Sequence, residues 1–63
     1  MTFEDKAKKF TSNLVLVLKK TGYSKDTIIG GLDEGAKILN NCNLSAPVKR
    51  IVLQAIEDAK KEV

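Results

Sequence analysis

The chain has 63 residues, a net charge of +3 and one cysteine, Cys42. A chain this short forms a single domain and buries only about 60% of the surface that it exposes when unfolded. One cysteine excludes an internal disulfide, and the absence of histidine argues against a structural zinc site. We therefore treat residues 1–63 as one domain, for which we predict no metal and no cofactor.

The composition, 43% hydrophobic and 30% charged, is typical of a globular domain and not of a disordered chain. The longest apolar run is residues 14–18, far too short to span a bilayer. Charges within the first nine residues interrupt any signal-peptide pattern. With a lone thiol and no export signal, the expected compartment is the cytoplasm.

A first helix is predicted over residues 2–21. Thr2 is a suitable N-cap with Asp5 three residues later, and Gly22 is suited to the left-handed residue that follows a helix. Apolar residues recur at spacings of four and three, which keeps them on one helical face. They are Phe3, Ala7, Phe10, Leu14 and Val17. We expect this face to enter the core.

A second helix is predicted over residues 24–41, with Ser24 as its N-cap. Its apolar positions are Ile28, Ile29, Leu32, Ala36 and Leu39. Gly30, Gly31 and Gly35 weaken the pattern, because a glycine inside a helix costs about 0.5–1 kcal/mol relative to alanine. We expect a continuous helix; the alternative is a break near Gly30 into two short pieces.

A third helix is predicted over residues 45–62, capped by Ser45, with Pro47 in the first turn, where a missing N–H costs little. Short connections between three helices indicate an all-α, small three-helix bundle. The expected core combines the apolar positions of all three segments: Phe3, Ala7, Phe10, Leu14, Val17, Leu18, Ile28, Leu32, Leu39, Val48, Ile51, Val52, Ala55, Ile56 and Ala59.

Catalysis is not expected from this sequence. No histidine is present to act as a base near neutral pH, and no phosphate-binding glycine loop is found. Cys42 has no neighbouring base and is interpreted as a small, mostly buried apolar residue. We therefore predict that the chain is not an enzyme and find no indication of a small-molecule substrate.

The apolar excess of the first helix favours a protein contact. Val15 lies about 100° from the predicted core stripe and Leu16 about 160° from it, so Leu16 has no obvious place inside the chain. A second candidate patch contains Gly31, Gly35 and Ile38, whose spacing can form a groove for a partner helix. Leu53, at the edge of the apolar stripe of the third helix, could belong to either patch. We predict a small interaction or regulatory module that self-associates or binds a protein partner.

A nucleic-acid-binding regulator is the main alternative. In a helix-turn-helix-like arrangement, Lys49 and Arg50 would begin the recognition helix, while Lys8 and Lys9 would contact phosphates. The chain has a single arginine, and acidic residues lie between its basic ones, so this alternative ranks second. A membrane-surface helix or a helical immunity-type protein ranks lower, because no motif supports either.

Overall fold

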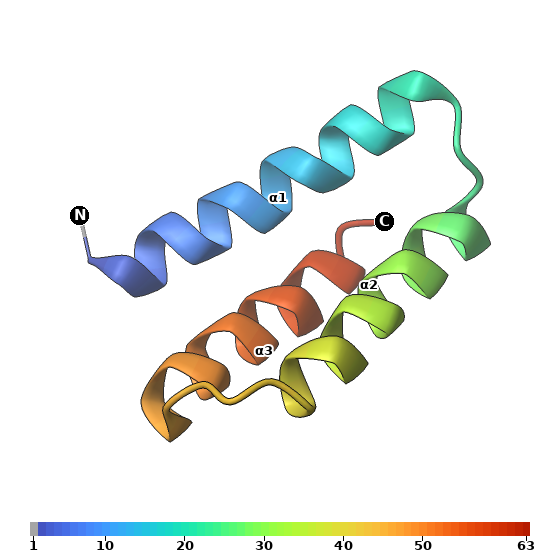
Figure 1. The fold of residues 1–63 in the computed structure, drawn as a ribbon. Helices are drawn as coiled ribbons and strands as arrows, with labels where there is room; N and C mark the ends of the chain where they lie inside the picture. Colours follow the sequence, from blue (N-terminus) through green and yellow to red (C-terminus); the bar gives the residue numbers. More distant parts are fainter. Residues whose placement is uncertain (1) are drawn as a thin grey trace.

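The computed structural model describes residues 2–63, which form three helices in succession. Helix α1 spans Phe3–Thr21, α2 spans Lys25–Asn40 and α3 spans Ala46–Lys60. No strand occurs among these residues, and the helices pack on one another as a small all-α bundle (Figure 1). The predicted fold class and the three predicted segments are confirmed, with ends that agree to within about two residues.

The ends of α1 follow directly from local sequence. The Thr2 hydroxyl accepts a hydrogen bond from the Asp5 backbone N–H at 3.2 Å, so it satisfies one of the free donors at the helix start. At the other end Gly22 has φ +102°, and the N–H of Tyr23 donates to the carbonyl of Leu18 at 3.3 Å. A left-handed glycine followed by this hydrogen bond is the Schellman motif, and it fixes the direction in which the chain leaves α1.

The starts of α2 and α3 show two kinds of capping. The Ser24 hydroxyl accepts from the Thr27 backbone N–H at 3.2 Å, as expected of an N-cap. Ser45 occupies the N-cap of α3 but makes no side-chain capping bond. Pro47 lies in the first turn and has no N–H to donate, which removes one of the usual partners for the Ser45 hydroxyl.

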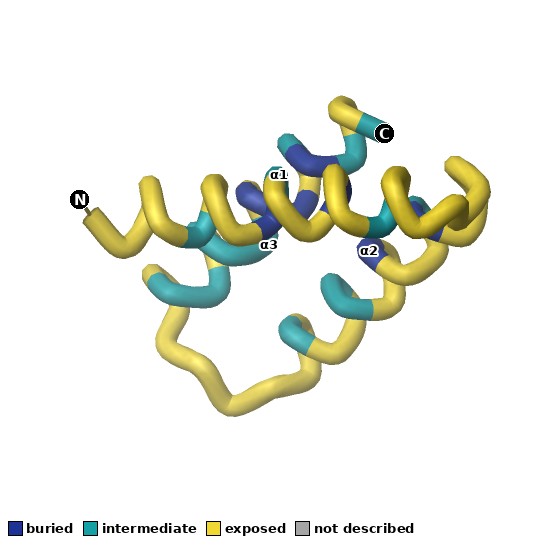
Figure 2. The backbone as a smooth tube through the Cα atoms, turned by 90° about the horizontal axis from the view of Figure 1, so that it is seen from above, coloured by how far each residue is buried: buried dark blue, intermediate teal, exposed yellow. Residues whose placement is uncertain are grey.

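Helix α2 is continuous through Gly30, Gly31 and Gly35, which confirms the favoured interpretation over a break at Gly30. Helices α2 and α3 run antiparallel, and α1 crosses them obliquely (Figures 1 and 2). The N-terminal turn of α1 extends past the start of α3 in both views. The molecule measures 34 × 27 × 15 Å, so it is wide and thin.

The core is small and lies where the three helices meet. Val15 of α1 is the largest fully buried side chain among the described residues, and it packs with residues of α2 and α3. Leu18, Ala36, Leu39, Val52 and Val63 pack against its edge. The fully buried apolar residues are Val15, Ile28, Leu32, Ala55, Ile56 and Ala59. The predicted core of α2 and α3 is thus confirmed for these residues, whereas the predicted core residues Val48 and Ile51 are only half-buried.

The prediction that the regular apolar face of α1 enters the core is wrong. Phe10 is 67% exposed and Val17 is 58% exposed, while Phe3 and Leu14 are also exposed. Instead α1 packs on α3 through the face that contains Thr11 and Val15. The physical reason is the shape of α3. Its contact surface presents the small residues Ala55 and Ala59, on which Thr11 and Val15 can lie more closely than phenylalanine rings.

Cys42, expected to be mostly buried, is exposed in the connection that follows α2. No helix among residues 2–63 combines the length and the apolar character that crossing a bilayer requires.

Candidate functional site

The most prominent surface feature is a row of apolar residues along α1, which we call the α1 stripe. Its spacing of four, three, four and three residues places every member on one side of the helix. The stripe consists of Phe3, Ala7, Phe10, Leu14 and Val17. Ala7 is half-buried and the other four are exposed. Large apolar side chains exposed in a continuous row mark an interaction surface more often than isolated ones do.

Hollows adjoin both ends of the α1 stripe. At its N-terminal end, a notch of about 370 Å³ lies between Phe3 and Phe10 of α1 and Val52 of α3. Toward its C-terminal end, Leu14 and Tyr23 border a hollow of about 280 Å³ that α2 closes on the other side. The surface is therefore a ridge with an apolar depression at each end, into which side chains of a partner can fit.

The two edges of the α1 stripe differ in character. One edge carries Lys6, Asn13 and Lys20 at intervals of seven residues, all three exposed to solvent. The opposite edge carries Thr11 and Leu18, which face the body of the protein, since Thr11 is buried and Leu18 packs against the core. A partner that covers the stripe would therefore contact lysine side chains along one edge and the body of this domain along the other.

The glycine patch on α2 is open. A Cβ atom added to Gly31 or Gly35 would meet nothing within 4 Å, so no helix of this chain packs closely there. Gly31 lines the hollow at the end of the α1 stripe, and Ile38 further along α2 is 58% exposed. Close packing within the chain is thus not the reason for these glycines, and the predicted second patch remains accessible.

The residues predicted for a partner contact do not come together. Val15 is 1% exposed and belongs to the core, so its predicted role as a surface contact is wrong: α3 covers the face on which it lies. Leu16 is exposed, as expected, but it projects from a different side of α1 than the stripe. Leu53 borders a separate depression on α3, between Lys49 and Glu57.

The residues of the nucleic-acid alternative are divided between α1 and α3. Lys8 pairs with Glu4 at 3.4 Å, and Lys9 is exposed on α1. On α3, the Lys49 ammonium donates to the Asn40 carbonyl at 3.2 Å, and Arg50 is exposed.

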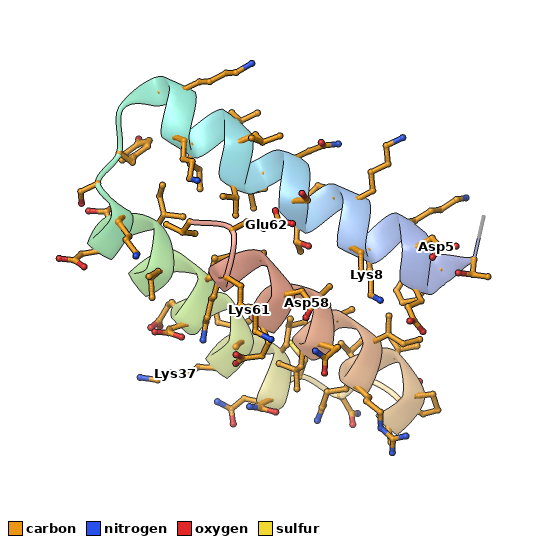
Figure 3. All side chains as sticks on the ribbon, turned by 180° about the vertical axis from the view of Figure 1, so that it is seen from behind. Asp5, Lys8, Lys37, Asp58, Lys61 and Glu62 are labelled. Atoms are coloured by element: carbon orange, nitrogen blue, oxygen red, sulfur yellow. The ribbon has the colours of Figure 1, made fainter. Side chains whose placement is uncertain are left out.

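Charges of both signs also share one side of the molecule. Figure 3 labels charged side chains of both signs in one view: Asp5, Lys8, Lys37, Asp58, Lys61 and Glu62. The surface around these residues is therefore mixed in sign, whereas a phosphate backbone is attracted by a basic patch.

A cluster of charges joins α2 to α3. Lys60 forms ion pairs with Asp33 of α2 and with Glu57 of its own helix. The hydrogen bond that the Lys60 ammonium donates to Asp33 is the main cause that raises the pKa of Lys60 above its ordinary value of 10.5; burial opposes this rise, and Glu57 adds to it. Through Lys60 the cluster links α3 to α2 at the protein surface.

Reasoning from the sequence found the α1 stripe but assigned it to the core. The signal that identifies its surface role is also in the sequence: α1 has apolar residues on two adjacent faces, and only one can lie on a partner helix of the same chain. The small residues Ala55 and Ala59 of α3 indicate which face packs internally, because the Thr11 hydroxyl reaches the Ala55 carbonyl and Val15 packs in one cluster with Ala59.

No protein-family model, curated protein or solved structure matches this chain. Function therefore has to be inferred from the surfaces that the fold exposes.

Proposed function

We propose that the protein is a small non-enzymatic interaction module that binds a helical protein partner through the α1 stripe. The observation that carries this proposal is the exposure of Phe3, Phe10, Leu14 and Val17 in one row, on a helix whose other apolar face is already buried. A domain that retains two apolar faces on one helix uses the first for folding and offers the second for binding.

The size of the exposed surface supports this proposal. The exposed fractions of Phe3, Phe10, Leu14 and Val17 leave roughly 400 Å² of apolar surface in contact with water. The largest apolar patch of a typical monomer covers about 300–600 Å² and is often functional. Covering the α1 stripe would contribute about 10 kcal/mol before the costs of association, which leaves a modest net affinity.

The spacing of the α1 stripe indicates the kind of partner. Residues at alternating intervals of three and four form the seam along which two helices pack, with each side chain inserted between those of the facing helix. An extended strand would need an exposed sheet edge, which no part of residues 2–63 supplies. The fitting partner is therefore an amphipathic helix that lies along α1.

Site-specific photo-crosslinking tests the proposal. We would replace Phe10 by benzoylphenylalanine and irradiate cells or concentrated protein, with the same replacement at Leu16 as the matched control. Both positions are exposed on α1, at 67% and 51%, but only Phe10 belongs to the α1 stripe. We expect crosslinked protein adducts from position 10 that position 16 does not give, reduced by Leu14→Glu. Equal crosslinking from both positions would contradict the proposal.

The same module is expected to act without nucleic acid. Binding of DNA or RNA that falls steeply with salt and that depends on Lys49 and Arg50, but not on Phe10, would favour the alternative regulator instead. Phe10→Glu separates the two functions, because it adds a negative charge to the α1 stripe and leaves Lys49 and Arg50 of α3 in place.

A further inference from the structure

We propose that the helical partner of the α1 stripe is acidic, with two carboxylates spaced to lie beside Lys6 and Lys20 while its apolar seam covers the stripe. This inference rests on the proposed function and names the chemistry of the partner. It follows from the charges along the free edge of the stripe, from their spacing and from the area that the stripe exposes.

The free edge of the α1 stripe is positively charged. Lys6 and Lys20 lie on the same side, about 60° and 100° around the helix from the centre of the stripe, and both are exposed. The two acidic residues of α1 lie elsewhere. Glu4 is on the opposite flank and pairs with Lys8 at 3.4 Å, and Asp5 is about 160° from the centre of the stripe. The free edge therefore attracts carboxylates and repels cations.

The hollows beside the α1 stripe have the same charge preference. Among the described residues that line them, Lys6 alone is charged, and it borders the notch between Phe3 and Phe10. A partner side chain that fills this notch brings the next turn of its helix within reach of the Lys6 ammonium. A carboxylate on that turn can accept a charge-assisted hydrogen bond, while the methylene groups of Lys6 extend the apolar wall.

The spacing of the two lysines makes the preference geometric. Lys6 and Lys20 are fourteen residues apart, which is roughly 21 Å along α1. Because fourteen residues are two heptads, both lysines hold the same position relative to a helix packed along the stripe. Asn13 lies midway and is neutral, so the middle heptad of the partner needs no carboxylate. The matching partner has acidic residues fourteen positions apart on one flank of its apolar seam.

The exposed area fits a single helix. Roughly 400 Å² of exposed apolar surface is about half of what each partner of a standard interface buries. An amphipathic helix laid along α1 can cover such a surface without a second folded domain. With so small an apolar contact, the two lysine pairs contribute a substantial share of the binding. We therefore expect a dissociation constant on the order of 100 μM that rises with salt.

Two designed helical peptides test the acidic partner. They have identical composition and the same seam of leucine and alanine, but one carries glutamates fourteen residues apart beside the seam and the other carries them on the far face. Fluorescence anisotropy with the full chain would measure binding at roughly 0.05 M and 0.5 M NaCl. We expect the flanking glutamates to tighten binding about fivefold at the lower salt concentration and about twofold at the higher one.

Charge reversal on the protein gives the matched control. The double variant Lys6→Glu, Lys20→Glu should prefer the peptide whose glutamates lie on the far face, because the flanking glutamates now meet like charges. The double variant Lys37→Glu, Arg50→Glu makes the same change of net charge at exposed positions of α2 and α3. Neither of these two residues lines the hollows beside the stripe. The control should therefore retain the wild-type preference, and circular dichroism checks that both variants remain helical.

Different outcomes overturn the acidic partner and the proposed function. Equal binding of the two peptides that is lost in Phe10→Glu retains the interaction function and overturns the acidic partner. A preference that survives reversal of Lys6 and Lys20, or wild-type dimers that exclude the peptides, has the same meaning.

Failure of both peptides to bind also overturns the acidic partner, while photo-crosslinking from position 10 decides the interaction function independently. Vesicles of phosphatidylglycerol and phosphatidylcholine are the remaining probe. Binding to these vesicles that depends on Phe10, without binding of either peptide and without protein crosslinks from position 10, would assign the α1 stripe to a lipid surface and overturn both proposals.

Discussion

The hydroxyl oxygen of Thr11 lies 3.3 Å from the carbonyl oxygen of Ala55, a contact between α1 and α3 across 44 positions of sequence. The same hydroxyl also lies 3.0 Å from the carbonyl of Lys8, one turn back on α1. Because Ala55 has no exposed surface, its methyl group leaves no space between the two helices. This close crossing determines which face of α1 is buried and which is left exposed.

We predict that Ala55→Leu destabilises the fold by about 1–3 kcal/mol, because three additional carbon atoms have to be accommodated beneath Thr11. Chemical denaturation followed by circular dichroism measures the change. Ala46→Leu is the control, since Ala46 is exposed in the first turn of α3. A loss of stability no larger than that of the control would show that the crossing at Ala55 is not closely packed.

Truncation of neighbouring valines on α1 distinguishes its buried face from its exposed one. Val15→Ala removes two methyl groups from the core and should cost about 2 kcal/mol, part of it from the cavity that remains. Val17→Ala makes the same change where the side chain is 58% exposed and should alter stability by less than about 0.5 kcal/mol. Unfolding should be measured at low protein concentration, so that self-association does not contribute.

If Val17→Ala proves as costly as Val15→Ala in the monomer, the assignment of the two faces is incorrect. If the cost of Val17→Ala appears only at high protein concentration, it reports self-association through the α1 stripe instead. The concentration dependence therefore makes the same pair of variants a second test of the α1 stripe.

Local sequence was sufficient to predict the helices and most of their ends. Thr2, Ser24 and Gly22 act within four or five residues of their own positions, so their roles can be derived from spacing alone. The burial of Ile28 and Ile56 was also predictable, since each lies within the only broad apolar stripe of its helix.

The face of α1 could not be predicted in this way. Phe10 and Val15 both belong to credible apolar faces, and the choice between them depends on α3, which lies more than thirty residues further along the chain. Periodicity measures how apolar a face is, and not how well its shape fits another helix. Periodicity therefore favours the larger and more regular face for the core, although that face is the exposed candidate site.

Glycine substitutions offer a test of backbone freedom. Gly30→Ala should stabilise the protein by about 0.5–1 kcal/mol, because alanine favours the helix and its Cβ would meet nothing within 4 Å. Gly22→Ala should instead destabilise it by about 1–2 kcal/mol, because φ at Gly22 is +102° and disfavours an L side chain. Thermal unfolding of the two variants should therefore shift in opposite directions, and a shift in the same direction would contradict the capping geometry.

The Lys60–Asp33 ion pair predicts how stability responds to high pH. The hydrogen bond to Asp33 raises the pKa of Lys60 above 10.5 in the folded protein, so folding favours the protonated ammonium. This stabilisation is complete below pH 10.5, the ordinary value that applies to the unfolded chain, and is lost as the pH rises through the higher folded value. The direction is thus a loss of stability in strong base.

A double-mutant cycle isolates the contribution of this pair from that of the other lysines. Wild type, Lys60→Met, Asp33→Asn and the double variant are unfolded by denaturant from about pH 8 to about pH 12. We expect a stabilising coupling between Lys60 and Asp33 that is constant up to the ordinary pKa of lysine and vanishes above it. A coupling that persists unchanged in strong base would mean that the two side chains interact through packing and not through charge.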